Sequence, residues 1–358
     1  MSILQFYKNK KVLITGHTGF KGSWLSYLLL NAGAEVTGFS LCPPTNPSLF
    51  EHLQLEKDMK SFVSDVADLE KLSKVFQEVQ PEIVLHLAAQ PIVRESYRNP
   101  VLTYQTNVMG TVNVLECVRN SDSVSSVLNV TTDKVYKNRE WERGYRENEE
   151  LCGFDPYSNS KSCSELVTYS YQNSFFADRD IAISTARAGN VIGGGDFATD
   201  RIIPDCFRMA SKGEEIIVRN PRSIRPYQHV LEPLMAYLTI AAKQSEQQEV
   251  AGNYNIGPDE ADCIPTGELV DLFCLSWQKY AGEKPVWINQ SDGGPHEANF
   301  LKLDCAKFKK TFAWKPVWHI DKAVDQTVKW YCAYAANEDM KAVMKTQVEE
   351  FTKDAGNE

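Results

Sequence analysis

The segment "YSNSK" places Tyr157 and Lys161 four residues apart. On a helix this spacing stacks the two side chains on one face. A lysine ammonium beside a phenol stabilises the phenolate and lowers the pKa of the tyrosine. Such a tyrosine can take a proton from a hydroxyl group while hydride leaves to a nicotinamide ring. Because a YxxxK pattern is common by chance, it needs support from other motifs.

A second candidate group is "TTDKVY", in which Thr132, Asp133 and Lys134 follow an apolar segment. The adjacent carboxyl and amine could be an acid and a base, and the alternative is a solvated turn. A lysine that acts as a base must be neutral, so its pKa must fall from about 10.4 through burial or a nearby cation. Lys134 could instead stabilise an enolate electrostatically.

The segment "VLITGHTGFKGSWL" places three glycines between an expected strand and an expected helix. Glycine permits a tight turn and lets the backbone approach a pyrophosphate closely. The N-terminus of the helix then offers free N–H groups to that phosphate. This context is typical of a dinucleotide site. The cofactor-binding residues predicted here are Gly16, His17, Thr18, Gly19, Phe20, Lys21 and Gly22.

Further cofactor contacts are expected where the next strands end. Around Ser40, at the end of the second expected strand, there is no acid for a ribose and no arginine for a 2′-phosphate. NAD is therefore preferred, and NADP stays open because Lys21 could reach a phosphate. Asp65 could accept a hydrogen bond from an adenine amino group, with Val66 donating from its backbone. The rest of the predicted cofactor site is Ser40, Leu87, Ala88, Ala89, Gln90, Asn107, Tyr157 and Lys161, whereas His86 is expected in the core.

The elements that must position these groups alternate between strand and helix. Strands are expected at 12–15, 35–41, 83–88, 124–130 and 181–186, and helices at 23–31, 68–80, 100–119 and 158–174. This alternation favours a parallel sheet covered by helices on both faces. The predicted fold class is therefore α/β, a Rossmann-type doubly wound sheet whose ligand lies beyond the carboxyl ends of the strands.

After about residue 190 the pattern loosens, and glycine, proline and arginine cluster between Gly193 and Pro233. Helices at 266–280 and 321–335 predict a smaller, discontinuous C-terminal domain. We assign 1–190 to cofactor binding, with segments near 225–260 as candidates to return to it, and 191–350 mainly to substrate binding. The final stretch, 349–358, is polar and expected to fray.

Composition narrows the class of protein. The 358 residues are 43% hydrophobic and 24% charged, and the net charge of -9 argues against nucleic-acid binding and against a basic membrane face. No apolar run approaches the roughly 20 residues of a membrane span, and the first residues lack a signal-peptide core. The 9 cysteines show no CxxC pair and no metal-ligand spacing, which predicts reduced thiols in the cytoplasm and no metal.

Taken together, the three glycines, Thr132, Tyr157 and Lys161 resemble the extended short-chain dehydrogenase/reductase superfamily. Within it, "TTDKVY" resembles the sugar-nucleotide 4,6-dehydratases, whose dTDP-glucose and GDP-mannose branches usually carry Asp-Glu at this place. Asp133-Lys134 is instead similar to the CDP-glucose branch. "GHTGFKGSWLS", "PTNPSLFE", "RAGNVIGGGDFATDRIIPD" and "HEANFLKLD" agree with that branch. The resemblance runs from residue 16 to about residue 305.

The resemblance implies an NAD-dependent lyase that converts CDP-glucose to CDP-4-keto-6-deoxyglucose and water, for deoxysugar and cell-surface polysaccharide biosynthesis. Oxidation at C4 acidifies the C5 proton, a base removes it, an acid protonates the departing C6 hydroxyl, and hydride returns to C6. It implies that Tyr157 and Lys161 serve the oxidation and that Thr132 holds the C4 hydroxyl. Asp133 would be the acid and Lys134 the C5 base.

The implied substrate carries two phosphates, whose oxygens match arginine forks. The predicted substrate-binding residues are Arg94, Thr132, Asn190, Arg201, Arg219, Arg225, His229, His296 and Glu297. The choice of cytosine rests on the resemblance, because no sequence feature distinguishes it physically from thymine or guanine. The resemblance also implies a homodimer or homotetramer, formed through helices of the first domain.

Two alternatives use the same fold. A sugar-nucleotide 4-epimerase would use Tyr157 and Lys161 without elimination, but epimerases of the superfamily lack the Asp133-Lys134 type of pair. A non-catalytic NAD-sensing regulator would usually lose the tyrosine and the lysine, and both are present.

Overall fold

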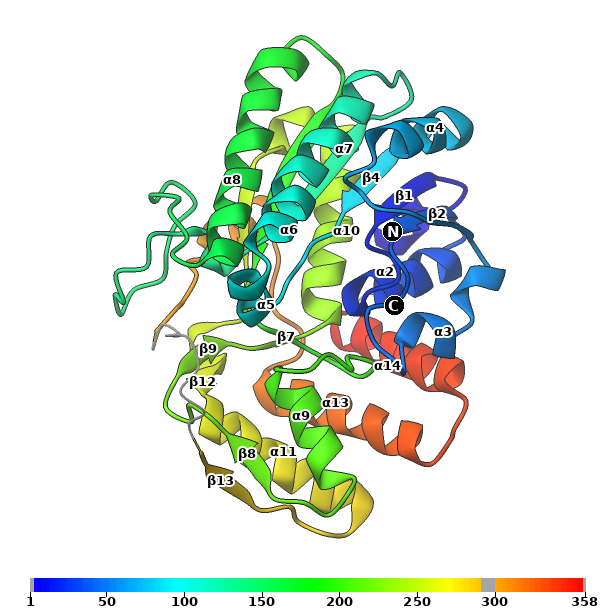
Figure 1. Ribbon diagram of the computed structural model, residues 1–358. Helices are drawn as coiled ribbons and strands as arrows, with labels where there is room; N and C mark the ends of the chain where they lie inside the picture. The colour runs from blue at the N-terminus through cyan, green and yellow to red at the C-terminus, as the bar shows by residue number, and fades with distance from the viewer. Residues whose placement is uncertain (1–2, 291–299, 357–358) are drawn as a thin grey trace.

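A computed structural model describes residues 3–290 and 300–356 (Figure 1). Within these residues the central sheet has seven strands in the order β11-β6-β5-β4-β1-β2-β3. All neighbouring strands pair in parallel. The predicted doubly wound fold is therefore confirmed. The strands are β1 (Lys11–Thr15), β2 (Glu35–Ser40), β3 (Lys60–Val63), β4 (Ile83–His86), β5 (Ser126–Thr132), β6 (Ala182–Ala188) and β11 (Asn253–Ile256).

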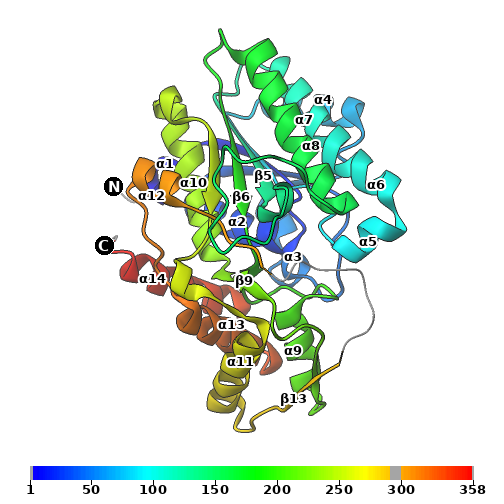
Figure 2. The ribbon, with the colours of Figure 1, turned by 90° about the vertical axis from the view of Figure 1, so that its left-hand side faces the viewer.

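Helices cover both faces of this sheet, as Figure 2 shows. On one face lie α4 (Leu69–Val79), α7 (Gly110–Arg119) and α8 (Pro156–Tyr171), and on the other lie α2 (Phe20–Asn31) and α10 (Leu231–Glu246). Side chains of a strand alternate between faces, so Leu13 of β1 joins one apolar core while Val12 and Ile14 join the other. Burial on both faces explains why these strands are continuous apolar runs.

The start of α8 is fixed by its own residues. The side chain of Asp155 accepts a hydrogen bond from the N–H of Ser158 at 2.9 Å, and Pro156 occupies the first helical position. Tyr157 therefore lies in the first turn, with Lys161 one turn further along the same face. The helix predicted over 100–119 is continuous, but it consists of α6 (Pro100–Tyr104), a π-helical segment η2 (Gln105–Met109) and α7.

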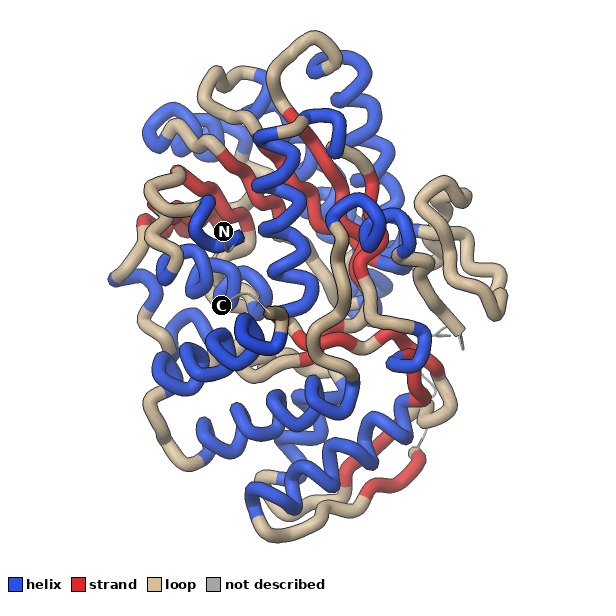
Figure 3. Tube along the Cα trace, turned by 180° about the vertical axis from the view of Figure 1, so that it is seen from behind, coloured by secondary structure: helices blue, strands red, loops and turns tan. Residues whose placement is uncertain are grey.

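A smaller lobe lies beyond the carboxyl ends of the strands, in the lower part of Figures 1 and 3. Its core is the pair α11 (Thr266–Ala281) and α13 (Ile320–Ala335). Around them lie α9 (Ile202–Ala210) and three short strand pairs. These are β7 (Val191–Ile192) with β10 (Gln228–His229), β9 (Ile224–Pro226) with β12 (Cys263–Pro265), and β8 (Ile216–Val218) with β13 (Trp287–Asn289).

The chain enters this lobe and returns to the sheet, because α10 and β11 follow α9 in sequence and join the first lobe. Both elements fall within or beside the segment 225–260, although the domain bounds drawn from the sequence stay a prediction. The remaining elements are α1 (Ile3–Phe6), α3 (Leu49–His52), η1 (Leu55–Lys57), α5 (Val93–Arg98), η3 (Asp133–Val135), η4 (Gln172–Phe176), η5 (Gln248–Val250), η6 (Glu260–Asp262), α12 (Ala306–Phe312) and α14 (Met340–Asp354).

The predicted fraying of 349–358 is wrong for most of that stretch. Helix α14 continues to Asp354, and Phe351 is 2% exposed and packs edge-on against Trp318, with ring centroids 5.1 Å apart. Apolar residues one turn apart give this polar helix a single buried face. Among residues 3–290 and 300–356, every helix is too short or too polar to span a bilayer.

Candidate active site

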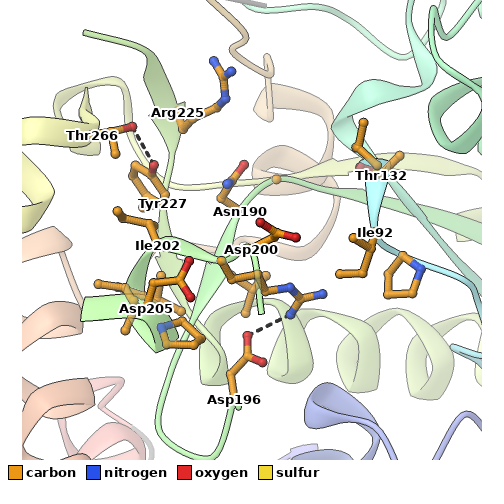
Figure 4. Close-up of a pocket in the computed structure, with 18 of the residues that line it drawn as sticks. Ile92, Thr132, Asn190, Asp196, Asp200, Ile202, Asp205, Arg225, Tyr227 and Thr266 are labelled. Atoms are coloured by element: carbon orange, nitrogen blue, oxygen red, sulfur yellow. Dashed lines mark hydrogen bonds and ion pairs between the residues drawn. The ribbon is translucent and has the colours of Figure 1, made fainter. Parts of the chain in front are cut away.

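A cavity of about 610 Å³ lies between the carboxyl ends of the strands and the smaller lobe. Its size is in the range of sites for small molecules and cofactors. Figure 4 shows Thr132 and Ile92 on one side of it and Ile202, Asp205, Tyr227 and Thr266 on the other. The predicted site residues that line it are Phe20, Lys21, Arg94, Thr132, Asp133, Lys134, Tyr157, Asn190, Arg201, Arg219 and Arg225.

The turn after β5 brings an acid into this cavity. The hydroxyl of Thr132 donates to Oδ1 of Asp133 at 2.9 Å, and Asp133 is 2% exposed. Its Oδ2 has no hydrogen-bond partner within the described chain. Burial raises the pKa of Asp133 above its usual value, although Lys134 and Thr132 oppose the shift. A raised pKa favours the protonated form of the carboxyl, and an unengaged oxygen suits it to donate a proton to a leaving group.

Lys134 follows Asp133 in η3 and lines the same cavity, where it is half-buried. Its backbone N–H donates to Oγ1 of Thr132 at 3.4 Å, which ties the two residues into one turn. Both roles considered for Lys134, a C5 base and an electrostatic stabiliser, are compatible with this position.

Tyr157 also lines the cavity, but its acidity differs from the expectation. Burial raises the pKa of Tyr157 to about 12, against the opposing effects of a hydrogen bond with Thr132 and the charge of Arg201. Lys161 is not among the main causes of this shift, and its Nζ donates to the carbonyl oxygen of Val130 at 3.0 Å. Burial lowers the pKa of Lys161 to about 8, with Glu165 opposing the shift. The predicted lowering of the tyrosine pKa by Lys161 is thus not seen in the protein alone.

The glycine loop fits a diphosphate. Gly16 has φ +79°, and a Cβ there would lie 2.7 Å from the backbone nitrogen of Ala88. A Cβ at Gly22 would lie 2.1 Å from the carbonyl oxygen of Gly16. At Gly19, by contrast, a Cβ would meet only that oxygen, at 3.5 Å, and no side chain caps α2 there. The first turn of α2 therefore presents N–H groups toward open space.

The other predicted cofactor residues lie along the same carboxyl edge of the sheet. Ser40 ends β2 and its Oγ lies 2.9 Å from Oγ1 of Thr18. Asp65 accepts from the N–H of Ala67 at 2.9 Å, in the turn that contains Val66. No arginine side chain joins Ser40 and Thr18 in these contacts.

The chain after β4 is held by Asn107 of η2. Its Oδ1 accepts from the backbone N–H of Gln90 at 2.8 Å, and its Nδ2 donates to the carbonyl oxygen of Gln90 at 3.1 Å. This keeps the half-buried segment of Leu87, Ala88 and Ala89 beside the glycine loop. Asn107 thus supports the loop through its side chain, and contact of these residues with a cofactor stays a prediction.

Two side chains of the glycine loop, those of His17 and Lys21, are engaged with other parts of the protein. The imidazole of His17 is fully buried, where a Cβ at Gly38 would lie 2.2 Å from it, and its Nε2 lies 2.7 Å from Oγ of Ser61. Only the backbone of His17 is therefore available to a cofactor. Lys21 packs on Tyr237, 3.4 Å from its hydroxyl, and lines the cavity beside Tyr157. It is not positioned at Ser40, where a 2′-phosphate would be expected.

Burial, together with the charges of Arg201 and Lys161, lowers the pKa of Lys21 to about 7, against the effect of Asp133. The charge of Lys21 therefore interacts with the charged groups at the end of the cavity that holds Asp133. The sequence could not predict this placement of the Lys21 side chain, because the rotation of the first turn of α2 decides its direction.

Three of the four predicted substrate arginines are paired with aspartates that the sequence prediction missed. Asp200 lies 2.7 Å from Nη1 of Arg219 and 3.9 Å from Nε of Arg94, and Asp196 lies 2.8 Å from Nη1 of Arg201. No local pattern indicated these pairs, because the chain neighbours Asp200 and Arg201 bond to different partners. Asn190, in the loop between β6 and β7, and Arg225 of β9 also line the cavity and are labelled in Figure 4.

A hydroxyl cluster at the far end was also missed. Oγ1 of Thr266 lies 2.9 Å from the hydroxyls of both Tyr227 and Ser223. No sequence signal could have joined Thr266 to the others, because the antiparallel pairing of β9 and β12 brings them together.

His229 is a correction to the predicted substrate set. It is 0% exposed, with its ring between Trp24 and Trp318 at centroid distances of 6.3 and 4.8 Å, and it does not line the cavity. Burial lowers its pKa to about 3, so it is a neutral core residue. His296 and Glu297 lie outside the described residues. In the described ranges, no group of three or more His, Cys, Asp or Glu residues is placed to hold a metal ion.

Comparisons with known proteins agree with this geometry. Residues 13–327 match the family model described as GDP-mannose 4,6 dehydratase. The chain is 46% identical over 352 residues to a CDP-glucose 4,6-dehydratase of Salmonella typhimurium, covering 97% of both proteins. It is 26% identical to a dTDP-glucose 4,6-dehydratase of Haemophilus influenzae, over 89% of this chain and 97% of that protein.

Solved structures show the same fold. A dTDP-glucose 4,6-dehydratase of Bacillus anthracis in complex with NAD gives a TM-score of 0.75 at 20% identity, covering 93% of this chain and 99% of that one. A UDP-glucose 4-epimerase of Thermotoga maritima with UDP-glucose gives 0.76 at 21% identity, covering 90% and 99%. The family model spans most of the sequence, and the chain therefore belongs to the GDP-mannose 4,6 dehydratase family.

Proposed function

We propose that this protein is an NAD-dependent CDP-glucose 4,6-dehydratase, which converts CDP-glucose to CDP-4-keto-6-deoxyglucose and water. The observation that carries the proposal is that Thr132, Asp133, Lys134 and Tyr157 line one cavity. The Salmonella relative supports the CDP substrate, since it is 46% identical over nearly the full length. Asp133-Lys134, in place of Asp-Glu, supports the same branch.

NAD, when bound, supplies the hydride acceptor for C4 and the hydride donor for C6. Tyr157 takes the proton of the C4 hydroxyl, which Thr132 orients, and for this step it must be in its phenolate form, so ligand binding has to offset the effect of burial on its pKa. Lys134 removes the C5 proton or stabilises the enolate that results. Asp133 protonates the departing C6 hydroxyl, so water leaves and the sugar retains a 4-keto group. When hydride has returned to C6, C5 takes up a proton again, so the water that is released corresponds to the C6 hydroxyl and the proton of the C4 hydroxyl.

The glycine loop, Ser40, Asp65, Val66 and the segment held by Asn107 would bind NAD. In the described residues, the side-chain contacts of Ser40 and Thr18 involve no cation that would favour a 2′-phosphate, and Lys21 is engaged with Tyr237. Arg94, Arg201, Arg219 and Arg225, with Asn190, would bind the nucleotide diphosphate. Because these four arginines line one cavity, the protein can bind an anionic ligand there although its net charge is -9.

We also propose a homodimer or homotetramer. Val101 and Leu102 of α6 are 69% and 46% exposed, and Leu166 and Tyr169 of α8 are 53% and 62% exposed. Helices α6 and α8 lie side by side, and we call these four exposed side chains together the α6/α8 patch. A large exposed apolar patch is typical of an interface. A cytoplasmic location is consistent with the free thiols of all the cysteines.

The test is to incubate the protein with CDP-glucose and NAD and to identify the product by mass spectrometry and NMR. We expect a 4-keto-6-deoxy sugar. Formation of CDP-galactose would mean an epimerase, and no turnover of any glucose nucleotide would favour the regulator. Parallel assays with dTDP-, UDP- and GDP-glucose test the base, and we expect CDP-glucose to have the highest kcat/KM.

A further inference from the structure

A buried ion pair lies directly behind the catalytic residues. Oε2 of Glu165 lies 2.7 Å from Nη2 of Arg187, and both side chains are 1% exposed. The same carboxylate accepts hydrogen bonds from Thr131 at 2.5 Å and from Thr185 at 2.7 Å. Buried ion pairs often contribute no more stability than apolar residues of the same volume. This pair therefore calls for a role other than stability.

The ion pair joins the two segments that carry the proposed chemistry. Glu165 lies one turn after Lys161 on α8, on the face that also carries Tyr157. Its partner Thr131 directly precedes Thr132 in β5. Nη1 of Arg187 donates to the hydroxyl of Tyr136 at 2.9 Å, and Tyr136 directly follows η3. The catalytic turn is thus held on both of its sides and tied to the catalytic helix.

We propose that Glu165 and Arg187 are positioning residues, which set the placement of the Tyr157–Lys161 face of α8 relative to the turn of Thr132, Asp133 and Lys134. The inference rests on the proposed function, since only there do the two segments act on one sugar. Proton and hydride transfers need reacting atoms in near-attack geometry, and a misplacement of about 1 Å can cost about 100-fold in rate. Neither Glu165 nor Arg187 lines the cavity, so each acts through the residues it holds.

Glu165 also acts on Lys161 by its charge, and this gives the proposal a specific signature. The groups that face Lys161 are the carbonyl oxygen of Val130 on β5, Glu165 on α8, His86 on β4 and Lys21 on α2. Glu165 is the carboxylate in this set, and its charge raises the pKa of Lys161, whereas burial lowers that pKa. Loss of its charge would leave Lys161 to lose its proton at a lower pH.

The first test is Glu165→Gln, which keeps the size of the side chain and removes its charge. We expect kcat for CDP-glucose to fall about 10- to 100-fold, with KM changed by less than about threefold. We also expect the alkaline limb of the kcat profile to move to lower pH. Glu165→Asp keeps the charge and shortens the side chain, so kcat should fall while the alkaline limb stays at its wild-type position.

The matched control is Gln244→Leu. Gln244 is also fully buried and also ties β5 to β6, through Ser126 at 2.8 Å and Ser184 at 2.5 Å, but at the amino ends of these strands. We expect it to lose thermal stability and to retain the wild-type kcat and pH profile. Folded Glu165→Gln with wild-type kcat and alkaline limb would overturn the proposal. The proposal would also be overturned if Gln244→Leu and Glu165→Gln were equally stable and showed the same loss of kcat and the same shift of the alkaline limb.

A measurement without turnover separates this inference from the proposed function. In wild type, Nζ of Lys161 lies 3.0 Å from the carbonyl oxygen of Val130. Crystal structures of the two proteins should show this distance lengthened in Glu165→Gln, and an unchanged distance would contradict positioning. If wild type makes no 4-keto product, the proposed function fails while this distance still tests positioning. If Glu165→Gln does not fold, the double variant Glu165→Gln/Arg187→Met is used in both measurements. The double variant leaves no buried charge unpaired.

Discussion

Asp133 and Lys134 are neighbours in the chain, yet they have different surroundings. Asp133 is buried, with one carboxyl oxygen unengaged in the described chain and its pKa raised by burial. Lys134 is half-buried at the wall of the cavity. A short helical turn points consecutive side chains in different directions, so one residue can be buried while the next lies at the wall of the cavity. The residues for oxidation and those for elimination should therefore be separable by mutation.

We predict that Asp133→Asn and Lys134→Ala spare cofactor reduction and block elimination, whereas Tyr157→Phe stops the reaction before reduction. The loss in each step should be about 10²- to 10⁴-fold, the usual contribution of one acid or base. Reduction is followed by the absorbance of the reduced nicotinamide, and elimination by the 4-keto product. Exchange of the C5 hydrogen with solvent at the normal rate in Lys134→Ala would contradict its role as the base.

At the scale of elements, the sequence predicted the parts whose signal is local. Buried parallel strands are apolar runs that end in glycines or polar residues, so β1, β2, β4, β5 and β6 were found, with ends shifted by a few residues. β3 was missed because Lys60–Val63 is short and exposed at both of its ends. The Tyr157–Lys161 face was predictable because helix geometry fixes it.

Placement that depends on tertiary packing was not predictable. The short strand β10 gives no indication of which way His229 faces, and packing turned it into the core. Similarly, the contact of Lys21 with Tyr237 joins residues 216 positions apart in the chain. Asp196 and Asp200 come from a loop whose path no local pattern specifies.

Helix α14 offers a test at this scale, because its apolar face is what holds the end of the chain. We predict that Phe351→Ala lowers the free energy of unfolding by about 3–5 kcal/mol, since it removes a buried ring that packs on Trp318. Urea denaturation measures this change. The exposed Lys353→Ala is the control, with an expected change within about 0.5 kcal/mol. Equal stability of Phe351→Ala and wild type would mean that the tail does not dock.

For the whole molecule, the α6/α8 patch predicts self-association. Leu166→Glu with Tyr169→Glu places two charges where a partner's apolar side chains would pack, so the assembly should dissociate to monomers. Light scattering after size-exclusion chromatography measures the mass, and circular dichroism checks that the fold is kept. Lys345→Glu, an exposed charge reversal on α14, should leave the mass unchanged. A wild-type protein that is already monomeric at micromolar concentration would contradict the proposed interface.

The buried histidines predict how the whole molecule responds to acid. Burial lowers the pKa of His17 to about 4 and the pKa values of His86 and His229 to about 3, whereas in the unfolded chain histidine titrates near 6.5. Between pH 6.5 and 4 the unfolded state therefore binds more protons, and stability falls as the pH falls. Burial raises the pKa of Glu232 to about 7, which acts in the opposite sense but is one group against three.

We therefore expect a net loss of about 3 kcal/mol in the free energy of unfolding between pH 7 and pH 5. Urea denaturation at several pH values in this range measures the slope. In His86→Gln, which can still hydrogen-bond Thr15 and Thr111 but cannot titrate, the slope should fall by about one proton. Stability that stays level or rises from pH 6.5 to pH 5 would mean that these histidines are not held neutral by the fold.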